Sequence, residues 1–329
     1  MIPAGRDFVI DHKTTSKDLG DGSPFWTRLR LDLQVSTYLV GARSLGFDPV
    51  GAVWDVVRKP SIKPLKATPL EERKYTKATA KQPSRLYANQ SDVDEPLEDF
   101  RARLAADIAA NPDSYYRRGF VVRSVEEERQ AAFDRWGVVA QIDHCRTLQW
   151  WPRAPGACER YGSLCPYFDV CTGTTTIDDA TRFRRDDRHD AAPRRLPIVS
   201  PSAMTTFQRC PREYHYSNEL RMRPVKTVEA LAFGTLLHSG LEAWWQTVSL
   251  DAAFAALETP NDEHRVVAEE LLRGYHARWI NEPLDVLAVE AEFAAPLVDP
   301  LTQMTASRVA LGGRIDAIAR VANGTEKTA

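Results

Sequence analysis

Two short segments at opposite ends of the chain carry side chains that together suit the binding of a metal ion. The C-terminal segment reads Gly-Arg-Ile-Asp-Ala-Ile over residues 313–318 and contributes Asp316. The N-terminal segment reads Phe-Val-Ile-Asp-His-Lys-Thr over residues 8–14 and contributes Asp11 and Lys13. Carboxylates hold Mg²⁺ or Mn²⁺ against a phosphate, and a neighbouring lysine can orient the attacking water. These residues predict metal-dependent phosphodiester hydrolysis if the two segments meet in space.

The local sequence supports this interpretation to different degrees in the two segments. Asp11 and Lys13 lie two residues apart in a pattern that favours a β-strand, so both side chains project from one face. On its own, such a pair is an ordinary surface ion pair. Asp316 has a more specific setting, because Ile315 and Ile318 make the rest of its strand apolar.

The two segments occur in the reverse of the order that a hairpin would need. Reading residues 198–329 before residues 1–173 turns them into a strand, a turn and a second strand. Three explanations stay open at this point. The chain is a circular permutant with its ends at a hairpin tip, or two molecules each supply half a site, or the gene boundaries are an artefact.

A site within one chain makes a geometric prediction. Residues 7–14 and 313–321 should be neighbouring antiparallel strands of one mixed sheet, with Met1 close to Ala329. The two aspartate carboxylates should then lie about 4–6 Å apart around a shared cation. Pairing the strands within one molecule also removes two open sheet edges, which would otherwise promote aggregation.

One histidine and two glutamates extend the set of candidate ligands. His238 lies in Phe-Gly-Thr-Leu-Leu-His-Ser-Gly-Leu-Glu, residues 233–242. A lone histidine on an apolar helix is more often a core residue than a ligand. Here Gly234 allows close packing, and imidazole is a reasonable ligand for Mn²⁺. Glu290 and Glu292 precede the Asp316 strand and are candidate acids around the metal ligands.

The cysteines form a second pattern. Cys158, Cys165 and Cys171 make a compact trio, with six and then five residues between them. Four thiolates hold either a zinc ion or a [4Fe–4S] cluster, and the two Cys-x₂-Cys pairs that are usual in a zinc ribbon are absent. Disulfides are not expected in a cytosolic protein. Cys145 is expected to be an ordinary buried thiol.

Composition places the chain among globular proteins. It has 329 residues with 43% apolar and 27% charged side chains and a net charge of −2. No apolar run long enough for a transmembrane helix or a signal peptide occurs, so we expect a cytoplasmic protein, bacterial or phage-encoded within a bacterial host. Nine Lys and Arg stand against two acids from Arg58 to Arg85. Such a run is usually a solvated loop, although it can also follow a phosphate backbone.

Periodicity and breaker residues predict a chain in two complementary halves. Residues 1–173 and 198–329 flank a linker at 174–197, which is rich in Thr, charge and Pro. Strands are expected at residues 6–14, 52–58, 286–297 and 309–321, and a basic loop at 59–90. Helices are expected at residues 25–46, 95–110, 124–145, 227–248 and 262–279, with one more that starts at Ser200-Pro-Ser and contains Phe207 and Cys210.

Taken in permuted order, the motifs resemble a known family. They are Ser200-Pro-Ser, Cys210-Pro-Arg-Glu-Tyr, Gly234-x₃-His238, Gly313-x-Ile-Asp316, Asp11-x-Lys13 and Gln34-x₃-Tyr38. Together they resemble the RecB-like branch of the PD-(D/E)XK nuclease superfamily. The resemblance is closest to phage and CRISPR-associated exonucleases that carry an iron–sulfur cluster. It covers nearly the whole chain outside the linker, with Asp11 where the family often has Glu and with a longer first cysteine gap.

The resemblance implies a fold and a role for each of these residues. The fold would be α/β, a restriction-endonuclease-like mixed sheet flanked by helices, with a helical iron–sulfur subdomain and circularly permuted order. His238, Asp316 and Asp11 would bind Mg²⁺ or Mn²⁺, and Lys13 would be the catalytic lysine. Gln34 and Tyr38 would face the DNA. Cys210 would be the fourth cluster ligand beside Cys158, Cys165 and Cys171, and the cluster would join the two halves.

The implied activity is a metal-dependent DNA exonuclease acting on single strands or ends, with a helicase or recombination protein as a possible partner. A covered cleft lined with basic residues and aromatics such as Trp150 and Trp151 would suit the threading of a strand. The alternative is a non-catalytic, cluster-bearing DNA-binding or assembly subunit of a recombination, repair or CRISPR adaptation complex. A third interpretation is an inert fragment of a larger helicase–nuclease. This chain contains no Gly-x₄-Gly-Lys-Ser/Thr loop, so no ATPase motor of the common kind is expected in it.

Overall fold

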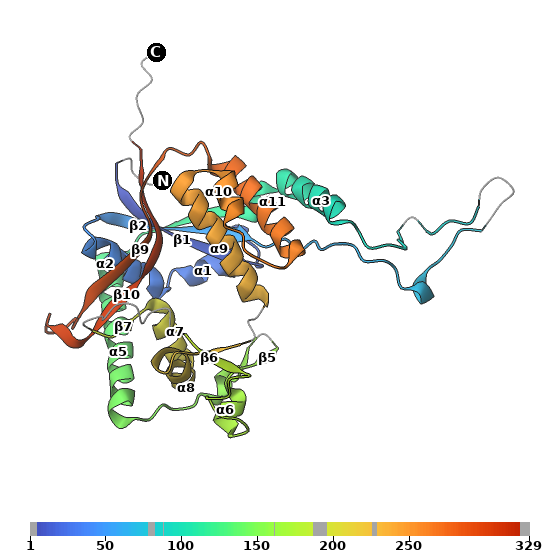
Figure 1. The fold of residues 1–329 in the computed structure, drawn as a ribbon. Coiled ribbons are helices and arrows are strands. Elements are labelled where there is room, and N and C mark those ends of the chain that lie inside the picture. The colour runs from blue at the N-terminus through green and yellow to red at the C-terminus, as the bar shows by residue number, and fades with distance from the viewer. Residues whose placement is uncertain are drawn as a thin grey trace, which may run out of the picture.

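A single mixed β-sheet forms the centre of the molecule, with helices on both of its faces (Figure 1). The computed structural model describes residues 5–77, 83–87, 89–160, 162–186, 196–225 and 229–322. The strand order is β3–β2–β1–β10–β7, and β9 also pairs with β10. The strands are β1 (Asp7–Thr15), β2 (Pro49–Arg58), β3 (Tyr116–Val121), β7 (Ile198–Val199), β9 (Leu284–Val298) and β10 (Thr305–Val321). The predicted α/β fold with a mixed sheet flanked by helices is confirmed.

The first and last long strands of the chain are neighbours in this sheet. β1 and β10 pair antiparallel, with Val9 opposite Ile318 and Ile10 opposite Ala317. Beyond the ladder, the N–H of Gly5 donates to the carbonyl of Val321 at 2.9 Å. The predicted pairing of the two terminal segments within one molecule is therefore confirmed. Met1 and Ala329 themselves lie outside the described residues.

β1 has a parallel neighbour on its other side. Asp11 lies opposite Trp54 of β2, and Lys13 lies opposite Val56. β2 then pairs antiparallel with β3, and β10 pairs antiparallel with β9. The sheet is mixed because its central strand has one parallel and one antiparallel partner.

Alternation along the strands divides the core into two layers. Val9 packs in the layer with α2 (Leu33–Ser44), α5 (Val125–Leu148) and α7 (Pro201–Arg209). Ile10 packs in the opposite layer with α3 (Leu97–Ala110), α9 (Glu229–Thr247) and α11 (Asp262–Trp279). The two layers hold the sheet, and therefore the carboxylates on β1 and β10, in a fixed place.

Helix ends follow from capping residues, and in two places they correct the sequence prediction. The helix expected at 25–46 is two helices, α1 (Pro24–Leu29) and α2, because the side chain of Asp32 caps a new start by accepting from the N–H of Gln34 at 2.8 Å. Ser200 caps α7 as predicted, but Cys210 is not in that helix. It is extended, with φ −156°, because the following Pro211 disfavours helical geometry before it.

The remaining elements are short. They are α4 (Pro112–Tyr115), α6 (Phe168–Thr172), α8 (Pro211–Tyr214), α10 (Leu250–Ala255), β4 (Glu159–Arg160), β5 (Ser163–Leu164), β6 (Phe183–Arg185) and β8 (Met222–Pro224), with single turns at Leu70–Glu72, Pro155–Ala157 and His215–Glu219. β6 lies in the predicted linker and pairs with β8, and residues 187–195 of that linker lie outside the described part. No helix among the described residues is long and apolar enough to cross a membrane.

Candidate active site

The pairing of β1 with β10 brings the two sequence segments together at a buried position. The backbone N–H of His12 donates to Oδ2 of Asp316 at 2.7 Å. Asp11, the residue before it, has a side chain that is only 4% exposed. The electrostatic influence of Asp316 reaches Asp11, because it raises the pKa of that carboxyl. The two predicted acids therefore share one buried environment, supplied from opposite ends of the chain.

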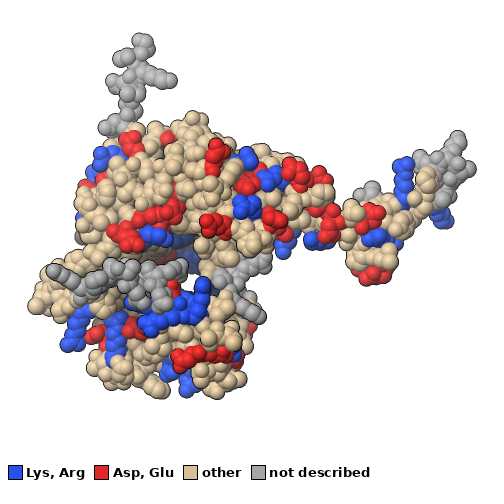
Figure 2. Space-filling model, viewed as in Figure 1, with Lys and Arg blue, Asp and Glu red and all other residues tan. Residues whose placement is uncertain are grey.

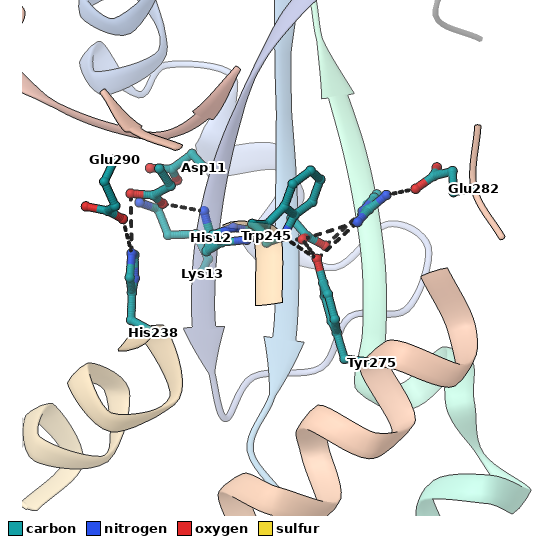
Figure 3. Close-up of polar contacts among 11 residues, drawn as sticks. Asp11, His12, Lys13, His238, Trp245, Tyr275, Glu282 and Glu290 are labelled. Atoms are coloured by element: carbon teal, nitrogen blue, oxygen red, sulfur yellow. Dashed lines mark hydrogen bonds and ion pairs between the residues drawn. The ribbon is translucent and has the colours of Figure 1, made fainter. Parts of the chain in front are cut away.

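His238 and Glu290 complete a group of three potential ligands around Asp316 (Figure 3). Nε2 of His238 lies 3.3 Å from Oε1 of Glu290 and 3.4 Å from Oδ1 of Asp316. Their ligand atoms all lie within 4.8 Å of one another. One imidazole and two carboxylates fit Mn²⁺, and the carboxylates alone fit Mg²⁺. The sequence had given Glu290 only as an acid around the ligands.

Glu290 reaches this position through an unusual backbone conformation. Its neighbours Val289 and Ala291 pair with Ala317 and Ile315, so Glu290 stands across the ladder from Asp316. Its φ is +51°, in the left-handed region that residues other than glycine rarely adopt. Oε2 of Glu290 also lies 2.5 Å from Nε of Arg314, which balances part of its charge.

The pKa shifts reflect the crowding of negative charge. Burial, followed by the nearby Asp316, raises the pKa of Asp11 to about 6, although Lys13 opposes the shift. Hydrogen bonds to Asp316 and to Glu290 raise the pKa of His238 to about 10. The two carboxylates thus favour the protonated imidazole of His238. His238 would release that proton on binding a divalent cation.

The segment that carries these three ligands also resembles a known family. Residues 198–326 match the family model of the PD-(D/E)XK nuclease superfamily. The match suggests a metal-dependent nuclease that acts on DNA, and this superfamily usually uses Mg²⁺ or Mn²⁺. Searches of curated proteins and of solved structures give no match. Asp11 and Lys13 lie outside the matched residues, near the other end of the chain.

Lys13 lies between the buried acid Asp11 and a polar side chain of α2. Its Nζ lies 2.5 Å from Oδ2 of Asp11 and donates to Oε1 of Gln34 at 2.9 Å. Nε2 of Gln34 in turn donates to the hydroxyl of Tyr38 at 2.8 Å. Tyr38 is buried, and burial followed by the charges of Asp11 and Asp316 raises the pKa of its hydroxyl. Gln34 therefore contacts Lys13 directly, and Tyr38 is connected to Lys13 through Gln34.

Behind β1 lies a polar network that was not predicted from the sequence (Figure 3). Nδ1 of His12 lies 3.1 Å from Oδ2 of Asp55, and Nε of Arg118 lies 3.0 Å from Oδ1. The hydroxyl of Tyr275 donates to Asp55, and Nε1 of Trp245 donates to that hydroxyl at 3.0 Å. These contacts join strands β1, β2 and β3 to helices α9 and α11. The signal available in the sequence was an aspartate in the otherwise apolar strand that contains Asp55.

The charge of Asp55 is well compensated. The residue is 1% exposed, and burial alone would raise its pKa. Arg118 and His12 more than offset that effect and lower the pKa of Asp55 well below its ordinary value. The Arg118 guanidinium also lies over the Trp279 ring, 4.1 Å from its centroid, and contacts Glu282. The network is therefore a buried, charged support for the strand that carries Asp11 and Lys13.

The four predicted cluster cysteines line one cavity of about 160 Å³. They are Cys158, Cys165, Cys171 and Cys210. The short β4–β5 hairpin lies between Cys158 and Cys165, so the two cysteines are close in space. The N–H of Cys165 donates to the carbonyl of Cys158 at 2.7 Å. Burial raises the pKa of Cys165 to about 11, so a bound cation would be needed to keep it as a thiolate. Cys145 packs in the apolar core, as predicted.

Trp150 and Trp151 differ in their surroundings. Trp150 is exposed, with Arg212 lying 5.0 Å from its ring centroid. Trp151 is 5% exposed and packs against Tyr214 and His215. The expectation that both line a strand path is therefore wrong for Trp151, because its ring is part of the core.

Proposed function

We propose that the protein is a metal-dependent DNA nuclease whose site is assembled from both ends of one chain. The observation that carries the proposal is the position of Lys13 and Asp11 beside the His238, Glu290 and Asp316 group. The matched family model supports a nuclease, and the paired strands β1 and β10 supply the remaining acid and the lysine.

His238, Glu290, Asp316 and Asp11 would hold Mg²⁺ or Mn²⁺ at this site. When bound, such an ion lowers the pKa of a coordinated water and neutralises charge on the scissile phosphate. Lys13 would orient that water and stabilise the charge that develops on the phosphate. The Lys13 ammonium group is held between the carboxylate of Asp11 and the side-chain oxygen of Gln34.

We infer that the substrate is a single strand or a DNA end, which makes the enzyme an exonuclease. Support comes from the resemblance of its motifs to RecB-like exonucleases. Figure 2 shows basic side chains bordering a hollow between the body and the smaller lobe that contains the cysteine segment. A hollow with such a border suits a polyanionic strand.

We also infer a structural [4Fe–4S] cluster held by Cys158, Cys165, Cys171 and Cys210, with zinc as the alternative occupant. The support is the convergence of the four thiols on one cavity. Three of these cysteines come from the first half of the sequence and one from the second. The cluster would therefore bind the two halves together, and it would have no redox role in hydrolysis.

Circular permutation best accounts for the order of the motifs. The match to the family model ends at residue 326, just after β10, and the resemblance implies that β1 supplies the strand that follows. β1 lies beside β10 in this molecule, so a second molecule is not needed to complete the site. The division into residues 1–173, a linker at 174–197 and residues 198–329 stays a prediction.

The decisive experiment is cleavage of end-labelled DNA by the purified protein with Mn²⁺ and with chelator. We expect linear single strands to be degraded with Mn²⁺ and to stay intact with chelator. Circular single strands should resist degradation in both conditions. Lys13→Ala should reduce cleavage by at least about 100-fold, because a positioned donor to the developing charge is lost. Lys17→Ala, an exposed lysine near the end of the same segment, is the matched control and should cut normally.

Two results would remove the proposal. One is cleavage that persists in excess chelator. The other is equal activity of Lys13→Ala and the unchanged protein. Binding of DNA without any cleavage in Mg²⁺ or Mn²⁺ would instead favour the non-catalytic assembly subunit.

A further inference from the structure

An arm leaves the body between β2 and α3 and projects far from the sheet (Figure 1). It comprises residues 59–95, of which 59–77, 83–87 and 89–95 are described. Backbone hydrogen bonds cross it along its length, from Glu95 to Leu65 at 2.8 Å, from Thr68 to Ser91 at 2.8 Å and from Tyr87 to Lys74 at 3.0 Å. The sequence predicted only a loop here, whereas the described parts form a paired, elongated hairpin.

The arm divides into a neutralised root and a basic outer end. At the root, Asp94 pairs with Lys66 at 3.3 Å and Glu95 pairs with Arg103 at 2.7 Å. From residue 73 to residue 90 the sequence has no acid and five basic residues, which are Arg73, Lys74, Lys77, Lys81 and Arg85. Figure 2 shows blue side chains gathered at this outer end.

Three of these basic side chains are available for a ligand. Lys74, Lys77 and Arg85 are exposed. Within the described part of the chain, no hydrogen bond or ion pair occupies their side-chain nitrogens. Three exposed cations in a stretch of sequence without an acid form a surface that is complementary to phosphates.

An aromatic ring lies among these cations. Tyr75 bridges Leu86 in antiparallel fashion, and the flanking hydrogen bonds join Thr76 to Arg85 and Tyr87 to Lys74. Residues opposite each other in an antiparallel pair share a face, so Lys74, Arg85 and Tyr87 lie on one face of the hairpin. Tyr87 is 45% exposed. An exposed ring with one cation opposite it and another two residues along its strand can stack an unpaired base and hold the phosphates beside it.

The root of the arm lies next to the candidate active site. Lys13 and Thr15 of β1 pair with Val56 and Arg58 of β2, and the N–H of Lys59 then donates to the carbonyl of Thr15 at 2.7 Å. The arm therefore begins just beyond the level of Lys13. Nζ of Lys59 also lies over the Phe233 ring, 4.7 Å from its centroid, on the helix that carries His238.

We propose that the outer end of the arm binds single-stranded DNA and holds the strand that the active site cleaves. The second half of this statement rests on the proposed function, but binding by the arm does not. The exposed Leu65, Leu70 and Val93 on the arm would suit a protein partner. The acid-free outer end, with Tyr87 beside Lys74 and Arg85 on one face, favours a nucleic acid instead.

The test is binding of a fluorescent single-stranded oligonucleotide in chelator, where no cleavage occurs. Lys74→Glu combined with Arg85→Glu should weaken binding at least about tenfold. The slope of log affinity against log salt concentration should become shallower by roughly 0.7 for each of the one or two phosphate contacts that are lost. Tyr87→Ala should weaken binding about tenfold through lost stacking. Arg129→Glu combined with Arg308→Glu reverses two exposed charges elsewhere and should bind normally.

A second measurement separates binding from folding and from catalysis. All variants should keep the thermal unfolding midpoint of the unchanged protein. They should also hydrolyse a small thymidine nitrophenyl phosphodiester at the same rate in Mn²⁺, because that substrate does not reach the arm. Binding that survives without any hydrolysis would remove the proposed function and leave binding by the arm intact.

Three outcomes would overturn the proposal. One is that the unchanged protein binds no single-stranded DNA. Another is that the arm variants bind it as well as the unchanged protein, which would leave the exposed leucines for a protein partner. An equal loss of duplex binding in the Tyr87→Ala variant would overturn the assignment to single strands.

Discussion

Glu290 is the residue whose geometry most clearly departs from a regular strand. Its φ of +51° costs on the order of 1–3 kcal/mol for a side chain with a Cβ. Such a conformation persists only where surrounding contacts fix it, and at Glu290 those contacts are with His238 and Arg314. The strain is consistent with a role as metal ligand.

Replacing Glu290 tests this role. Glu290→Gln keeps the size of the side chain and removes its charge. We expect the Mn²⁺ concentration for half-maximal cleavage to rise by about tenfold or more, in line with the loss of a group at a metal site. Glu292→Gln, an exposed neighbour two residues away, should leave that concentration unchanged. An unaltered metal dependence in Glu290→Gln would exclude Glu290 as a ligand.

The sequence indicated these two acids but could not choose between them. Strand alternation puts residues two apart on the same face, so Glu290 and Glu292 looked equivalent. The left-handed backbone at Glu290 interrupts that alternation. The Glu290 side chain is 9% exposed, whereas Glu292 faces solvent. A backbone outlier fixed by distant contacts leaves no trace in local sequence pattern.

Among the elements, the junction of α7 and α8 decides how the cysteine site forms. Cys210 is extended between the two helices because Pro211 starts α8.

Protein prepared without oxygen should contain iron. Cys210→Ser should lose that iron and unfold at a lower temperature. Cys145→Ser, a change in the apolar core, should retain the metal. Elemental analysis distinguishes these outcomes, and stoichiometric zinc without iron would replace the cluster with a four-thiolate zinc site.

The network behind β1 makes a prediction about pH. Arg118 and His12 hold the pKa of Asp55 below its ordinary value, so the ionised carboxylate stabilises the fold at neutral pH. That contribution is complete above the pKa of the unfolded state, about 4, and is lost as the pH falls toward the lower pKa of the folded state. Asp55→Asn should therefore cost about 3–5 kcal/mol at pH 7 and progressively less below pH 4.

Denaturant unfolding at several pH values measures this cost. Asp94→Asn is the matched control, because Asp94 is an exposed acid paired with a lysine on the arm. It should change stability little at any pH. A cost for Asp55→Asn that stays constant from pH 7 to pH 3 would contradict the assignment of the low pKa to Asp55.

Elements with strong caps and clear periodicity were predictable, and the others were not. α11 (Asp262–Trp279) has the predicted bounds, because Asn261 caps an amphipathic stretch. β3 (Tyr116–Val121) was missed, since its half-buried polar residues show no alternation and only pairing with β2 makes it a strand. The Asp55 network was missed for the same reason. Its partners come from segments that meet only in the folded protein.

At the scale of the whole molecule, permutation predicts that the chain tolerates a different starting point. A rearranged chain that runs from residue 196 to 322 and then from 5 to 186 should fold and cleave DNA. The new junction lies where the N–H of Gly5 already donates to the carbonyl of Val321 at 2.9 Å, so a short connection suffices. Circular dichroism and the cleavage assay measure the outcome.

A chain opened inside β2, between Val53 and Trp54, is the matched control. Both residues are buried, so this chain should fail to fold. If the chain that starts at residue 196 is equally unfolded, the strand order is not a permutation of a continuous ancestral sheet. For a site within one chain, the reversed motifs predicted the pairing of β1 with β10, because that pairing unites their acids. The motifs did not decide between one molecule and two.

The pairing of β1 with β10 also has a consequence for synthesis. β1 leaves the ribosome before any other strand of the sheet, and β10 leaves it after all of them. Asp11 and Lys13 are therefore synthesised long before Asp316. A chain without β10 would lack Asp316, one of the proposed metal ligands. Under the proposed function, hydrolytic activity would appear only once β10 is available to pair with β1, so a chain interrupted before β10 would be an inactive product.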